Sequence, residues 1–199
     1  MVQRPSHSAG SHRIRAFIAV DLDEEVKHAL RPVLKRVRER CGRSDVKWLP
    51  EENWHLTVKF LGDVPWLEVG RVGKLMQAVA AEAAPFELRV EGLGAFPPGR
   101  APRIVSAGIV AGGAELAKLH AALDASLATM GIPPENRGFK AHLTLGRVRG
   151  HAEMLWEALR EYEAAPFGAC EVDKLVLYQS ELESRGAQYT ALASGKLGR

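Results

Sequence analysis

The sequence predicts an α+β fold made of two like lobes that face each other. Segments with strand-like and helix-like patterns alternate along the chain, and their order repeats in the second half. Two short strings repeat as well: HLT occurs at 55–57 and 142–144, and EAAPF occurs at 82–86 and 163–167. Both pairs hold corresponding places in the two halves, which indicates a duplication. The alternative is one α+β domain in which these matches are coincidental.

The first half is expected to alternate strands with helices. Apolar and β-branched residues at 14–22 predict the first strand. Asp23 is the expected N-cap of a helix whose apolar residues recur at helical spacing as far as Cys41. Pro32 should kink or divide this helix. The elements that follow are a strand at 54–61, a helix at 66–83 and a strand at 86–96.

The second half repeats this order and adds a strand at its end. Its expected elements are a strand at 104–110, a helix at 114–130, a strand at 141–148, a helix at 152–163 and strands at 170–179 and 188–193. We therefore expect a flexible N-terminal tail at 1–13 and a single bilobed domain at 14–199. Its half-repeats should span about 14–98 and 102–196.

The composition is ordinary for a globular protein and excludes several classes. The chain has 199 residues, of which 46% are hydrophobic and 26% charged. No apolar run approaches the ~20 residues that a membrane span needs, so no membrane partner is expected. Cys41 and Cys170 lie far apart, which suggests neither a disulfide framework nor a thiolate zinc site. We expect a cytoplasmic protein, and its net charge of +3 permits an anionic partner without requiring one.

The two HLT strings carry the candidate chemistry. With seven histidines and four threonines in the chain, two His-x-Thr triplets are far more than chance would give. Side chains alternate along a strand, so His55, Thr57 and Lys59 are expected on one face, and His142 and Thr144 share a face in the second string. The intervening residues are expected to enter the core: Trp54, Leu56, Val58 and Phe60 in the first string, and Leu143 and Leu145 in the second.

Two imidazoles and two hydroxyls around one small anion suit phosphoryl transfer. An imidazole with a pKa near ~6.5 can accept or donate a proton at neutral pH, while hydroxyls can bind the non-bridging oxygens. Cationic side chains nearby in sequence could neutralise the developing charge; these are Lys59, Lys140, Arg147 and Arg149. Strict alternation would place Arg147 on the wrong face, and a bulge at Gly146 could correct this.

These strings, in their context, resemble the two-histidine (2H) phosphoesterase superfamily. The likeness is greatest to its RNA 2′,3′-cyclic phosphodiesterase branch, historically called 2′-5′ RNA ligase. It runs from about Ile14 to Leu192 and is carried by RAFIAVDL, NWHLTVKFLGDV, GAFPPGRAPRIVSAG and FKAHLTLGRVR. The resemblance implies two lobes whose antiparallel sheets line a central cleft, with helices outside.

The resemblance also implies a reaction and its site. A 2′,3′-cyclic phosphate at an RNA end would be hydrolysed to a 2′-phosphate without metal or cofactor, and the reverse reaction would join ends through a 2′-5′ bond. His55 would donate a proton to the departing 3′ oxygen, and His142 would accept one from water. Thr57 and Thr144 would hold the phosphate, assisted by Arg147. The partner would be an RNA or oligonucleotide with a cyclic phosphate end, and we expect a monomer.

Other interpretations remain open at this point. Phe17 could stack on a nucleobase, or it could pack in the core. His28 and His120 lie in predicted helices and are expected at the surface or its boundary. A zinc enzyme could use His55 and His142, although no third ligand is evident. A non-catalytic module that binds RNA ends is the other alternative.

Overall fold

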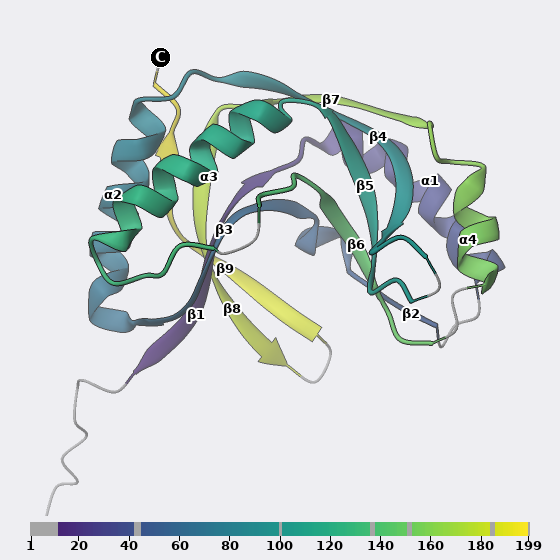
Figure 1. Ribbon diagram of the computed structural model, residues 1–199, viewed down its shortest axis with the longest axis horizontal. Helices are drawn as coiled ribbons and strands as arrows, with labels where there is room; N and C mark the ends of the chain where they lie inside the picture. The colour runs from purple at the N-terminus through teal and green to yellow at the C-terminus, as the bar shows by residue number, and fades with distance from the viewer. Residues whose placement is uncertain are drawn as a thin grey trace, which may run out of the picture.

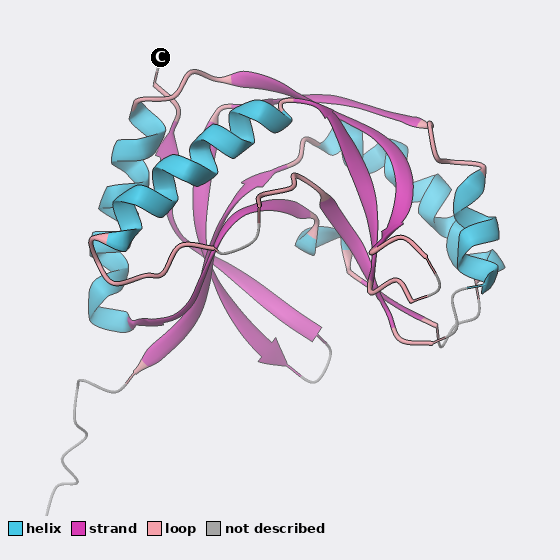
Figure 2. Ribbon diagram, viewed as in Figure 1, coloured by secondary structure: helices cyan, strands magenta, loops and turns pink. Residues whose placement is uncertain are grey.

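The computed structural model describes residues 12–41, 45–99, 101–135, 138–150, 153–183 and 186–198 (Figure 1). The chain forms two curled antiparallel sheets, and helices cover the outer side of each (Figure 2). The predicted α+β fold with two lobes is therefore confirmed. Most of the predicted tail, residues 1–11, lies outside the described residues, whereas Arg13 already begins the first strand.

One sheet, called sheet A here, has four strands in the order β3-β1-β8-β9. Its strands are β1 (Arg13–Asp21), β3 (His55–Pro65), β8 (Lys174–Glu183) and β9 (Gly186–Lys196). The helices α2 (Val69–Ala81) and α3 (Gly113–Ala128) pack against it. A short 3₁₀ helix at Trp66–Glu68 precedes α2.

The other sheet, called sheet B, has five strands in the order β2-β6-β5-β4-β7. Its strands are β2 (Val46–Trp48), β4 (Phe86–Phe96), β5 (Ile104–Ala111), β6 (Leu143–Val148) and β7 (Pro166–Val172). The helices α1 (Glu24–Arg40) and α4 (Glu153–Arg160) cover it, and a 3₁₀ helix at Glu51–Asn53 leads into β3. Both sheets draw strands from both halves of the sequence. The division into half-repeats at 14–98 and 102–196 stays a prediction.

Pro32 was expected to kink or divide helix α1, and the helix continues through it undivided, whereas the kink stays a prediction. Proline removes one backbone donor and is unfavourable inside a helix. Here the helix buries an apolar stripe against sheet B, and this packing outweighs the loss. The buried stripe consists of Val26, Leu30, Leu34 and Val37.

The predicted strand at 170–179 is two strands in different sheets. β7 ends at Val172 in sheet B, and β8 begins at Lys174 in sheet A. The junction is the charged pair Asp173-Lys174, which interrupts the alternation of buried residues, and the prediction overlooked this sign of the crossing. The sequence also gave no indication of the three-residue strand β2. None of the described helices is long and apolar enough to cross a bilayer.

Candidate active site

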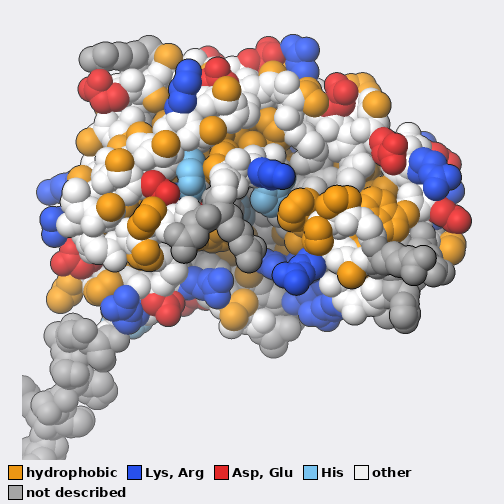
Figure 3. Space-filling view, viewed as in Figure 1, with side chains coloured by type: hydrophobic (Ala, Val, Ile, Leu, Met, Phe, Trp, Pro, Cys, Tyr) orange, Lys and Arg blue, Asp and Glu red, His pale blue; other side chains and the backbone are white. Residues whose placement is uncertain are grey.

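The two HLT strings lie in different sheets that contact each other through β3 and β6. His55 begins β3 in sheet A, and His142 directly precedes β6 in sheet B. Figure 3 shows histidine side chains near the middle of one face, with Lys and Arg side chains beside them. Segments 87 residues apart in sequence are thus brought to one place by the packing of the two sheets.

A β-bulge follows the first HLT string. Thr57 and Lys59 lie opposite consecutive residues of β1, so Val58 is an extra residue in β3. A bulge of this kind reverses the alternation beyond it. Lys59 therefore points into the core and is 1% exposed, whereas Phe60 is 58% exposed. The predictions that Lys59 would share the face of His55 and that Phe60 would be buried are both wrong.

A second bulge follows the other HLT string at the equivalent position. Thr144 and Gly146 lie opposite consecutive residues of β5, so Leu145 is the extra residue in β6. The sequence suggested a bulge at Gly146, and the observed bulge lies one residue earlier, at Leu145. Because of this bulge, the side chains of Arg147 and Thr144 lie on the same face of β6.

Arg147 is exposed, and its positive charge acts on Tyr189 of sheet A. Burial raises the pKa of the Tyr189 phenol in β9, and the positive charges of Arg147 and Arg15 act against this rise. Tyr189 in turn lies edge-on to the His55 ring at 5.2 Å between centroids. The two sheets therefore bring a cation of β6 to the surroundings of the first histidine.

Aromatic rings hold His55 in place. Phe17 stacks on the imidazole at 4.8 Å between ring centroids, with 22° between the planes. Tyr178 stacks with Phe17 at 5.4 Å, and Tyr189 meets Phe17 edge-on. Phe17 is only 4% exposed, and it is buried by these rings of the site rather than within the hydrophobic core cluster. Its predicted contact with a nucleobase is untested. Tyr178 and Tyr189 were not identified from the sequence, because only the sheet order brings β8 and β9 to this face.

Burial makes His55 a weak base. It lowers the pKa of the imidazole to about 4, although the negative charge of Asp21 and a hydrogen bond to the Asn53 backbone act in the opposite direction. Asp21 lies opposite His55 in the ladder and accepts a 2.8 Å hydrogen bond from the Tyr178 hydroxyl. Burial and the Asp21 carboxylate raise the pKa of Tyr178. Tyr178 is therefore a neutral donor, and His55 is neutral at pH 7.

Each imidazole is oriented by a hydrogen bond. The His142 ring is exposed, and its Nδ1 lies 2.8 Å from the carbonyl oxygen of Lys140. A carbonyl only accepts, so Nδ1 carries the proton and the neutral ring keeps its lone pair on Nε2. The Nε2 of His55 lies 3.2 Å from the Thr57 hydroxyl oxygen. With the Asn53 backbone on the other nitrogen, this hydroxyl donates to Nε2.

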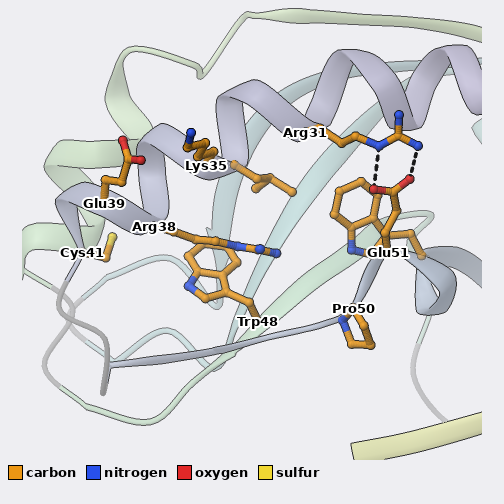
Figure 4. A pocket seen from close by; sticks show the side chains of 10 residues that line it. Arg31, Lys35, Arg38, Glu39, Cys41, Trp48, Pro50 and Glu51 are labelled. Carbon is orange, nitrogen blue, oxygen red and sulfur yellow. Dashed lines mark hydrogen bonds and ion pairs between the residues drawn. The ribbon is translucent and has the colours of Figure 1, made fainter.

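A separate cavity of about 750 Å³ lies between α1 and the segment from β2 to the 3₁₀ helix that precedes β3 (Figure 4). The Arg38 guanidinium lies 5.3 Å from the centre of the Trp48 ring, and Arg31 pairs with Glu51. Neither HLT string lines this cavity. Burial raises the pKa of the thiol in its lining, Cys41, which makes that thiol a weak nucleophile.

A metal centre at this site would need a third ligand beside His55 and His142. Within the part of the chain that the structure describes, no three His, Cys, Asp or Glu side chains are grouped so as to hold a metal ion. A chelator assay addresses the zinc alternative directly.

The chain matches the sequence model of a family described as LigT like Phosphoesterase, over residues 20–105 and 109–189. It is 36% identical over 179 residues to an RNA 2′,3′-cyclic phosphodiesterase of Archaeoglobus fulgidus, covering 90% of this chain and 98% of that protein. It is 31% identical over 187 residues to the protein of that name from Aquifex aeolicus, with 93% and 98% covered.

Solved structures share the fold. The protein TT0787 of Thermus thermophilus superposes with a TM-score of 0.79 at 32% identity, over 94% of this chain and 100% of that one. LigT of E. coli in complex with 3′-AMP superposes with a TM-score of 0.74 at 23% identity, over 94% and 100%. At that identity, the second comparison supports the fold alone.

Proposed function

The chain belongs to the LigT-like phosphoesterase family, and from this premise we propose that it hydrolyses the 2′,3′-cyclic phosphate ends of RNA to 2′-phosphates. The reaction uses His55 and His142 and needs no metal. The observation that carries the proposal is the pair of HLT strings in facing sheets, each followed by a bulge directly after its threonine. The names of the relatives support the same substrate class.

The two histidines act on opposite sides of phosphorus, because attack is in line with the departing oxygen. The Nε2 atom of His142 accepts a proton from water as the water oxygen bonds to phosphorus. The bond from phosphorus to the 3′ oxygen breaks, and His55 donates a proton to that oxygen. The phosphate remains on the 2′ oxygen, and proton exchange with solvent resets both rings.

His55 must be protonated to serve as the donor, although burial disfavours its charged form. A bound phosphate supplies the compensating negative charge, since an opposite charge within ~4–6 Å favours the charged form. Protonation also reverses the hydrogen bond with Thr57, because Nε2 then donates. The Thr57 hydroxyl is released to donate to a phosphate oxygen. Substrate binding and charging of the acid are therefore coupled.

Thr144 and Arg147 complete the phosphate site from sheet B. The bulge at Leu145 puts both side chains on one face of β6. The hydroxyl donates to a non-bridging oxygen, and the guanidinium neutralises the charge that develops in the transition state. If a 5′-hydroxyl takes the place of water, the same in-line attack, with departure of the 3′ oxygen, gives a 2′-5′ phosphodiester, so the chain also ligates RNA ends.

The test is turnover of a defined oligonucleotide with a 2′,3′-cyclic phosphate end in the presence of EDTA. We expect hydrolysis at the same rate with and without the chelator. Activity that is lost with EDTA and restored by Zn²⁺ would support the zinc enzyme instead. Tight binding of the oligonucleotide without turnover would support the non-catalytic module.

A further inference from the structure

A cluster with the buried side chains of Lys59 and His120 at its centre lies behind the first HLT string and joins three segments of the chain. We call it the clasp. It consists of Val58 and Lys59 in β3, His120 and Asp124 in α3, and Glu135 and Phe139 in the segment between α3 and β6.

The Lys59 ammonium is the charged centre of the clasp. Its Nζ lies 2.7 Å from Oδ1 of Asp124, in an ion pair rather than an aligned hydrogen bond. It also donates to the carbonyl oxygen of Pro133 at 3.1 Å and lies 3.8 Å from Oε1 of Glu135. Burial would raise the pKa of Asp124, but Lys59 and the Glu135 N–H hold it below its usual range. A buried charge is costly without partners, so these contacts fix the lysine in one geometry.

His120 links the bulge to the segment before β6. It is 7% exposed and thus buried, so the expectation that it would lie at the surface or its boundary is wrong. Its Nδ1 donates to the carbonyl oxygen of Val58 at 2.8 Å, and Val58 is the extra residue of the bulge. Its ring stacks on Phe139 at 4.8 Å between centroids, with 21° between the planes. One side chain therefore contacts the residue after Thr57 and a residue three positions before His142.

Glu135 makes the second link between these segments. Its N–H donates to Oδ2 of Asp124 at 3.2 Å, and its Oε1 accepts from the N–H of Phe60 at 3.2 Å. Phe139, on which His120 stacks, directly precedes Lys140, whose carbonyl orients His142. Contacts thus connect β3, which carries His55, to α3, and they connect α3 to the residues directly before His142.

We propose that the clasp positions His55 and His142 relative to each other, and that Lys59 and His120 are positioning residues for the reaction. The inference rests on the proposed function, in which both imidazoles must address one phosphorus. The clasp itself does not touch substrate. Displacement of one catalytic group by about 1 Å can cost about 100-fold in rate, so a looser clasp should affect turnover more than binding.

The test compares two variants of His120. His120→Phe keeps a ring against Phe139 but lacks the donor to Val58, whereas His120→Asn keeps a donor and lacks the ring. We expect His120→Phe to lower kcat by about 10- to 100-fold with KM within about threefold. His120→Asn should retain more of kcat, because the bulge keeps its hydrogen bond.

Lys59→Met tests the charged centre and should lower kcat in the same way. Because it leaves Asp124 buried without its cation, the paired variant Lys59→Met/Asp124→Leu removes both charges and protects the fold. Leu30→Ala is the matched control: it opens a cavity beneath α1, which packs against β7 and α4 rather than against the elements of the clasp, and it should lower Tm but leave kcat unchanged.

A second readout separates failure of this inference from failure of the proposed function. In ¹⁵N-histidine NMR spectra, the imidazole signals of His142 should shift in Lys59→Met and His120→Phe but not in Leu30→Ala. Wild-type protein that hydrolyses no cyclic phosphate would overturn the proposed function, while the spectra would still report the coupling. Variants with wild-type kcat and unshifted His142 signals would overturn the clasp. If Leu30→Ala lowered kcat as much as the clasp variants do, the clasp would be overturned in the same way.

Discussion

The buried imidazole of His55 should make the stability of the protein depend on pH in a defined window. Its pKa is about 4 in the folded chain, against 6.5 for an unperturbed histidine. Between these values the unfolded chain binds a proton that the folded chain does not. The stabilisation is therefore complete above pH 6.5 and is lost as the pH falls towards 4.

The magnitude follows from the size of the shift. Each pKa unit corresponds to about 1.4 kcal/mol, so the full effect is about 3 kcal/mol. Between pH 7.5 and pH 5, the contribution of His55 to the free energy of unfolding should fall by about 2 kcal/mol.

Urea unfolding of the wild type and of His55→Gln at these two pH values measures this contribution. The other titrating groups cancel in the comparison, because both chains carry them. The wild type should lose about 2 kcal/mol more than the variant between pH 7.5 and pH 5. Equal losses in the two proteins would show that the imidazole titrates normally, and the account of its burial would be wrong.

Further predictions concern catalysis. His55→Ala and His142→Ala should each lower kcat by about 10²–10⁴-fold with the fold intact by circular dichroism; wild-type turnover in either would contradict its assignment. Thr57→Val and Thr144→Val should each cost less, since a hydrogen bond is lost while both proton-transfer groups remain; a loss as large as that of the histidine variants would contradict this. The acid limb of the kcat/KM profile should lie near pH 4, the pKa of His55 in the free enzyme, and an acid limb near 6.5 would contradict it. Arg147→Ala should lower kcat/KM in steady-state assays, and an unchanged value would remove this residue from the site.

The sequence predicted the elements that carry the chemistry because local patterns determine them. The alternation in β3 correctly placed His55 and Thr57 on a face opposite the buried Leu56. The helices and most strands followed from apolar periodicity in the same way. The antiparallel arrangement and the central cleft came from the resemblance, not from periodicity.

Features that depend on a partner strand could not be predicted. The bulge at Val58 arises from the pairing of β3 with β1, and it alone sends Lys59 into the core. Tyr178 reaches the site because β8 pairs with β1, although 157 residues separate it from Asp21. No pattern within a single segment carries such information.

The phosphorus NMR spectrum of the product formed in EDTA from a dinucleotide with a 2′,3′-cyclic phosphate tests the central claim most directly. The arrangement in which His55 faces the 3′ oxygen and His142 faces water predicts a single product, the 2′-phosphate. The absence of turnover in EDTA would contradict a metal-independent reaction. A 3′-phosphate as the sole product would contradict the roles assigned to the two histidines.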